Sequence, residues 1–159
     1  MAAPIRNAGI WFNCIALICM VAVGAALVSQ HVFNIQPCPW CALQRLILLT
    51  IAAVCLLAGV AGRPGRRIGA AVALLLALGG VIAALWQHFK AASSVSCNLT
   101  FADKILSGLH LDRVLPAVFE PRASCADAAV NLLGVPYDFW SLALFVLVGL
   151  ATARLLARR

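Results

Sequence analysis

The chain has 159 residues, of which 64% are hydrophobic and only 11% are charged. Its mean hydropathy is +1.02, whereas soluble domains carry about 25% charged residues. This composition excludes an ordinary soluble domain. We interpret the net charge of +7 as a signal of membrane topology, and we expect no nucleic-acid partner.

Four apolar segments of membrane-spanning length follow one another along the chain. They cover residues 8–29, 42–62, 68–89 and 139–157, and about 20 residues let a helix cross the bilayer. The first segment is longer than the apolar core of a signal peptide and lacks a clear cleavage site, so we expect it to stay in the membrane. The sequence therefore predicts an all-α membrane protein: a four-transmembrane-helix bundle that forms one domain over residues 1–159.

The arginines predict how this bundle is oriented. Seven of them lie near the N-terminus, in the connection 63–67 or near the C-terminus: Arg6, Arg63, Arg66, Arg67, Arg154, Arg158 and Arg159. The positive-inside rule places these three regions in the cytoplasm. The connections 30–41 and 90–138 then face outward, where disulfides persist. Short surface helices are expected near 101–106 and 114–119, within the long second outer loop.

The first outward connection leads into Cys38-Pro39-Trp40-Cys41, at the edge of the second apolar segment. A C-x-x-C pair usually belongs to a soluble redox domain or a zinc site, but this pair lies at the membrane boundary. We expect Cys41 at a helix N-terminus, where free N–H groups stabilise a thiolate. Arg45 is one turn further on the same helical face. It either adds a cation beside Cys41 or binds lipid phosphate, and the residues alone leave both roles open.

His88 lies near the outer end of the third apolar segment. We expect it at about the same depth in the membrane as Cys41 and Arg45. A histidine in this position either makes interfacial hydrogen bonds or donates a hydrogen bond to a carbonyl acceptor bound beside a thiolate. Both interpretations stay open at this point.

The seven cysteines fall into two groups. Three lie inside apolar segments and are predicted to be small packing residues: Cys14, Cys19 and Cys55. Four lie at or outside the membrane boundary: Cys38, Cys41, Cys97 and Cys125. An even number there fits two disulfides, which either staple loops or carry electrons. The C-x-x-C at the lipid edge favours an electron path into the membrane.

These residues together resemble a known family. They are His31-Val32, Pro37-Cys38-Pro39-Trp40-Cys41, Arg45, Gln87-His88, Cys97, Cys125, Leu133-Gly134-Val135-Pro136 and Trp140. Their order resembles that in disulfide bond formation protein B (DsbB), the bacterial inner-membrane thiol:quinone oxidoreductase. The resemblance covers nearly the whole chain. Gln44 is a departure, because Glu often precedes the arginine in this family.

The resemblance implies an enzyme that sustains protein disulfide formation. It implies two redox-active disulfides, Cys38–Cys41 and Cys97–Cys125, with Cys97 attacked by a periplasmic DsbA-like thioredoxin-fold oxidase. Cys41 would engage a membrane quinone near Arg45 and His88, with ubiquinone favoured over menaquinone and no metal. The protein would be a multi-pass protein of the bacterial inner membrane, with both termini in the cytoplasm and electrons leaving as quinol.

Three alternatives stay open. The first is a paralogue that serves a dedicated oxidase. The second is an enzyme of the vitamin K epoxide reductase class, although there the loop cysteines usually precede the membrane pair, and here they follow it. The third is a membrane protein that binds a soft metal through the outer cysteines and His88, although the loop cysteines are not spaced like zinc ligands.

Overall fold

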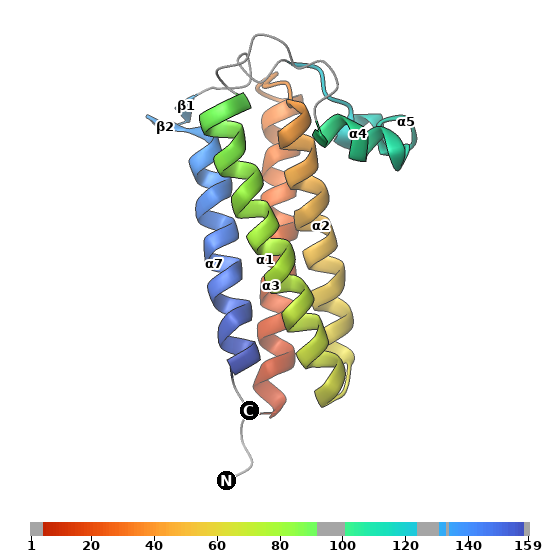
Figure 1. Ribbon diagram of the computed structural model, residues 1–159, viewed down its shortest axis with the longest axis vertical. Coiled ribbons are helices and arrows are strands. Elements are labelled where there is room, and N and C mark those ends of the chain that lie inside the picture. Colours follow the sequence, from red (N-terminus) through yellow and green to blue (C-terminus); the bar gives the residue numbers. More distant parts are fainter. Residues whose placement is uncertain (1–4, 92–100, 124–130, 133, 158–159) are drawn as a thin grey trace.

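The fold is a bundle of four long helices. The computed structural model describes residues 5–91, 101–123, 131–132 and 134–157. Within them, the bundle consists of α1 (Ile5–His31), α2 (Pro39–Val60), α3 (Arg63–Trp86) and α7 (Tyr137–Ala157). These helices run side by side along the long axis of the molecule (Figure 1). Each is long and apolar enough to cross a membrane, which confirms the predicted fold class.

The helix ends follow from local sequence signals. α2 begins at Pro39, ahead of the apolar run that starts at Ala42, because proline at a first helical position is compatible with the helix. Gly62 is the N-cap of α3, and Pro64 lies in the first turn of that helix. The start of α1, the α2–α3 connection and the end of α7 all lie at one end of the bundle (Figure 1). Cys38 therefore lies at the opposite end.

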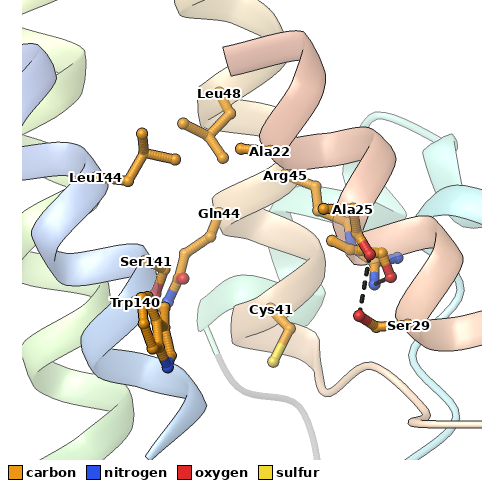
Figure 2. Close-up of a pocket in the computed structure, with 11 residues that line it drawn as sticks. Ala22, Ala25, Ser29, Cys41, Gln44, Arg45, Leu48, Trp140, Ser141 and Leu144 are labelled. Atoms are coloured by element: carbon orange, nitrogen blue, oxygen red, sulfur yellow. Dashed lines mark hydrogen bonds between the residues drawn. The ribbon is translucent and has the colours of Figure 1, made fainter. Parts of the chain in front are cut away.

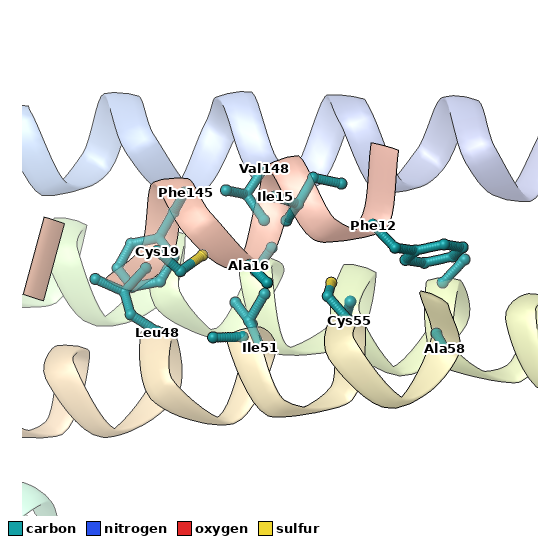
Figure 3. Packing of buried hydrophobic residues seen from close by; sticks show 14 of the residues in the cluster. Phe12, Ile15, Ala16, Cys19, Leu48, Ile51, Cys55, Ala58, Phe145 and Val148 are labelled. Atoms are coloured by element: carbon teal, nitrogen blue, oxygen red, sulfur yellow. The ribbon is translucent and has the colours of Figure 1, made fainter. Parts of the chain in front are cut away.

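The main core lies between the four helices. Phe12, Ile51 and Phe145 are fully buried in it, together with Cys19 and Cys55 (Figure 3). The burial of these two cysteines agrees with a packing role, whereas Cys14 lies on an exposed face. Many large apolar side chains point away from the bundle, among them Leu17, Leu57, Leu75 and Leu147. Such a surface suits a hydrocarbon environment rather than water.

Helices α3 and α7 approach each other closely at Gly80. A Cβ added to this residue would lie 2.3 Å from two ring carbons of Phe145, which is itself completely buried. Small residues commonly allow such close packing between membrane helices. The contact sets the spacing between α3 and α7 below the C-x-x-C end of the bundle.

The segment between α3 and α7 carries short elements. α3 continues into a π-helix, η1 (Gln87–Ala91), and three short helices follow: α4 (Phe101–Gly108), α5 (Leu111–Val114) and α6 (Pro116–Phe119). Strands β1 (Asn131–Leu132) and β2 (Val135–Pro136) pair antiparallel and lead into α7. The expected short helices near 101–106 and 114–119 are thus present as α4 and α6. Both lie beside the outer end of α2, and α4 places Leu106 in the same small core as Phe119.

Candidate active site

The first turn of α2 brings the two cysteines of the C-x-x-C together. Cys38 is the N-cap residue, and its sulfur accepts a hydrogen bond from the backbone N–H of Cys41 at 3.3 Å. The Sγ atoms of the two cysteines lie 2.7 Å apart. The expected position of Cys41 at a helix N-terminus is confirmed. Backbone N–H groups at such a terminus favour negative charge on a nearby group.

The two sulfurs have different surroundings. Cys38 is completely buried, packed in a small apolar cluster with Trp40, Ala83 and Ala102, which come from α2, α3 and α4. The ring of Trp40 lies 6.5 Å from that of Trp86. Cys41 is only half-buried and lines a cavity (Figure 2). The pair thus has one fully buried cysteine and one half-buried cysteine beside a cavity.

The cavity has a volume of about 240 Å³ and is bounded by α1, α2 and α7. Its walls are largely aliphatic: Ala22, Ala25, Ala26, Leu48 and Leu144. A few polar groups and one indole join them: Ser29, Cys41, Gln44, Arg45, Trp140 and Ser141 (Figure 2). An apolar cavity with a small number of oriented polar groups is typical of a small-molecule site. Here a thiol belongs to those polar groups.

Arg45 lies one turn beyond Cys41 and is 6% exposed. Its guanidinium donates to Gln30 Oε1 at 2.6 Å, to the Val118 carbonyl at 3.0 Å and to the Ala26 carbonyl at 3.3 Å. These three acceptors are neutral and come from α1 and α6. Arg45 therefore joins α2 to these two elements, and its cationic side chain lines the cavity that Cys41 enters.

A buried group of polar side chains lies on the other side of Cys41. Gln87, the first residue of η1, donates from Nε2 to Cys41 Sγ at 3.4 Å and to Asp138 Oδ1. Its Oε1 accepts from Gln44 Nε2 at 2.8 Å. Gln44, Gln87 and Asp138 are each less than 10% exposed. Side chains from α2, η1 and α7 thus meet beside the sulfur of Cys41.

His88 belongs to this group through Asp138. Its Nδ1 lies 3.6 Å from Asp138 Oδ2, and its ring contacts those of Phe89 and Phe139. His88 is not one of the described residues that line the cavity. The structure therefore directs the imidazole of His88 toward a carboxylate of α7, which also binds Gln87.

Comparisons with known proteins agree with this geometry. Residues 8–155 match the family described as "Disulfide bond formation protein DsbB". The chain belongs to the DsbB family. "Disulfide bond formation protein B" of Ralstonia nicotianae is 32% identical, over 96% of both chains. The protein of that name from Herminiimonas arsenicoxydans is 31% identical, over 86% of this chain and 87% of its own. "Disulfide bond formation protein B 1" of Pseudomonas savastanoi is 36% identical, over 84% and 80%.

The two expected loop cysteines, Cys97 and Cys125, lie outside the described residues. The segment just before Cys125 is nevertheless fixed to the site. The backbone N–H groups of Arg122 and Ala123 donate to the Pro37 carbonyl at 3.0 and 3.3 Å. Pro37 directly precedes Cys38, and Ala123 precedes Cys125 by two residues. The chain therefore comes next to the C-x-x-C shortly before Cys125 in the sequence.

Sequence reasoning missed two members of the polar group in this DsbB family protein. Asp138 was covered only as the last position of the outward connection 90–138, and Gln87 was named only beside His88 in the family resemblance. A carboxylate at the border of an apolar segment is the signal that could have been used, because a buried acid in a membrane helix usually has a functional partner.

Proposed function

We propose that this protein oxidises a DsbA-like thioredoxin-fold dithiol and passes the electrons through its two cysteine pairs to a membrane quinone. Family membership supports disulfide formation as the overall activity. The observation that carries the electron path is the asymmetry of the C-x-x-C. Cys41 opens into an apolar cavity of the bundle, whereas Cys38 is enclosed beneath α4.

The cavity suits the ring of a quinone. Its volume of about 240 Å³ lies below the ~300–1,000 Å³ of drug-sized sites, so it would hold a ring while an apolar tail stays in lipid. Arg45 could donate a hydrogen bond to a carbonyl oxygen, and the alanine and leucine walls match a flat apolar ring. When bound, a quinone supplies an acceptor for two electrons and two protons.

The residues of this chain would act in a defined order. A thiolate of the partner attacks Cys97, which breaks the Cys97–Cys125 bond and forms a mixed disulfide. The second thiolate of the partner resolves the mixed disulfide, so the partner leaves oxidised and the loop pair is reduced. Cys125 then attacks Cys38 and releases Cys41 as a thiolate. Cys97 then attacks Cys125 in the Cys125–Cys38 bond, which restores Cys97–Cys125 and leaves Cys38 and Cys41 reduced. Each of these exchanges replaces one S–S bond by another.

The burial of Cys38 supports this relay. Cys38 is 0% exposed, so a folded partner protein has no direct access to its sulfur. The backbone bonds from Arg122 and Ala123 to Pro37 hold the segment before Cys125 beside the C-x-x-C. A loop cysteine is therefore better placed than a separate protein to reach Cys38. In the bacterial inner membrane, this arrangement would have the C-x-x-C end in the periplasm and both termini in the cytoplasm, within one membrane domain.

Arg45 and the helix N-terminus would stabilise the thiolate of Cys41. The guanidinium is buried, and it donates to Gln30, Val118 and Ala26. A fixed cation beside a low-dielectric cavity favours negative charge that develops there. The same cation would hold a quinone oxygen in reach of Cys41, so that electrons leave the sulfur pair as Cys38 and Cys41 re-form their bond.

The test is anaerobic mixing of the purified protein with a reduced thioredoxin-fold oxidase and a short-chain quinone, followed by the absorbance of the quinone. Cys41→Ser is expected to abolish quinone reduction, while the loop pair still accepts the partner. Cys14→Ser is the matched control, because Cys14 is exposed on the outside of the bundle. Normal quinol production by Cys41→Ser would refute the assignment of Cys41.

A further inference from the structure

Asp138 is a buried carboxylate that the electron path does not use. It lies in the first turn of α7 and is only 4% exposed, although acidic side chains are rarely buried unless they are paired. Its Oδ1 accepts from Gln87 Nε2, and its Oδ2 lies 3.6 Å from His88 Nδ1. Two consecutive residues of η1 thus hold both oxygens of one carboxylate.

The contacts of Gln87 determine how its amide is turned. Nε2 faces Asp138 Oδ1 and Cys41 Sγ, while Oε1 faces Gln44 Nε2. An ionised carboxylate can only accept hydrogen bonds. The opposite orientation of the amide would place Oε1 against the carboxylate and against the sulfur, leaving buried acceptors without donors. Asp138 therefore selects the orientation in which an N–H group faces Cys41.

The π-helical geometry contributes to this arrangement. The α-helix of α3 ends at Trp86, and η1 starts at Gln87. π-Helical turns are rare and occur frequently at functional sites. Here the turn presents the side chains of both Gln87 and His88 to the same residue of α7, while Gln87 also reaches Cys41 on α2.

We propose that Asp138 is a positioning residue, which holds the Gln87 amide so that its N–H donates to the Cys41 thiolate. The proposal rests on the function proposed above, in which that thiolate is the reactive group. A donor to a charged sulfur stabilises the thiolate. Asp138 would thus control the reactivity of the C-x-x-C pair across two helices without contacting the sulfur.

Removing Asp138 has a second effect that a single variant cannot separate from the first. The carboxylate is an anion close to Cys41, and the loss of a like charge by itself favours the thiolate. Cys38, Arg45 and the Asp138–His88 pair are the other titratable or charged groups around this sulfur among the described residues. A double-mutant cycle between Asp138 and Gln87 cancels the charge effect, because each arm compares two proteins with the same residue at 138.

The experiment measures the thiolate of Cys41 directly in the reduced full-length protein in detergent micelles. Timed alkylation with iodoacetamide over a range of pH, read for the Cys41 peptide by mass spectrometry, gives the thiolate fraction. The cycle compares the parent, Gln87→Leu, Asp138→Leu and the double variant. Asp138→Asn serves as a second background, of nearly unchanged shape, in case Asp138→Leu does not fold. Asp112→Leu is the control, since Asp112 lies on α5 away from the site.

In the presence of Asp138, Gln87→Leu is expected to lower the thiolate fraction about tenfold at a given pH, because a hydrogen bond to a charged group changes the equilibrium by about that factor. In the Asp138→Leu background the same change is expected to have no effect, and in Asp138→Asn a smaller one. Asp112→Leu should match the parent. An equal effect of Gln87→Leu in every background, or none in the parent, would overturn the proposal.

This readout involves neither quinone nor partner, so its outcome is independent of whether Cys41 delivers electrons to quinone. Quinone turnover of the same four proteins then links the two results. The expected coupling between Asp138 and Gln87, together with no quinone reduction by the parent protein, would refute the proposed function and leave the positioning role of Asp138 intact.

Discussion

Gly80→Ala should loosen the contact between α3 and α7. The added methyl carbon would start 2.3 Å from two ring carbons of Phe145, whereas carbon atoms pack at about 3.5–4.0 Å. The ring must therefore retreat by more than about 1 Å. Phe145 is completely buried, so the ring has no free space to enter. Either the Phe145 side chain leaves its preferred rotamer, or the two helices move apart.

The expected magnitude follows from a comparison with the neighbouring glycine. Forcing an extra carbon into a packed core typically costs about 1–3 kcal/mol, while replacing glycine by alanine within a helix gains about 0.5–1 kcal/mol. A Cβ at Gly79 would have nothing within 4 Å, so Gly79→Ala should show only the gain in helix stability and no packing cost. Since both changes share the helical gain, the difference between the two variants is the packing cost alone, about 1–3 kcal/mol.

The assay is unfolding of each variant in a mild detergent with a rising fraction of SDS, followed by tryptophan fluorescence. The Trp40–Trp86 pair links α2 to α3 beside the site, so its emission reports separation of these helices. Gly80→Ala should unfold at a lower SDS fraction than the parent, and Gly79→Ala at the same or a higher one. Equal stability of the two variants would refute the inferred contact between Gly80 and Phe145.

Two further predictions concern the chemistry. Arg45→Met should raise the quinone KM and lower kcat, with a combined loss of about tenfold or more in kcat/KM, and Arg45→Lys should recover only part because a point charge does not replace a planar guanidinium. The control is Arg66→Met, which removes a donor to the Gly59 carbonyl at the other end of the bundle. If Arg45→Met had the same KM and kcat as the parent protein, Arg45 would have no role in quinone reduction. With the oxidised partner, Cys97→Ala should form no mixed disulfide, whereas in Cys125→Ala the Cys97 thiolate should attack the partner's disulfide and form one that no second loop thiol resolves. Non-reducing gels with the complex in Cys97→Ala instead would exchange the two roles.

The sequence was sufficient to predict the bundle, because the hydropathy and the length of each helix depend only on one continuous segment of the chain. The start of α2 was also predictable, since Pro39 after Cys38 is a typical helix start and places Cys41 in the first turn. The same one-turn spacing placed Arg45 near Cys41. These features depend on residues at most a few positions apart in the chain.

The partners of the site residues could not be predicted in this way. Gln87 and Asp138 are 51 positions apart, and they meet because α3 and α7 pack closely at Gly80 and Phe145. The acceptors of Arg45 come from α1 and α6, so its buried position depends on three elements at once. The π-helical turn at Gln87 also has no sequence pattern that distinguishes it from the α-helix before it.

The distribution of the polar group over α2, η1 and α7 has a consequence for how the protein is made. Cys41 precedes Asp138 by 97 positions, and ribosomes add roughly 5–20 residues per second. The thiol pair is therefore synthesised about 5–20 s before the carboxylate that completes its surroundings. A newly inserted chain would hold a C-x-x-C at the lipid edge without its full set of polar neighbours, and arrival of the last helix would complete the site.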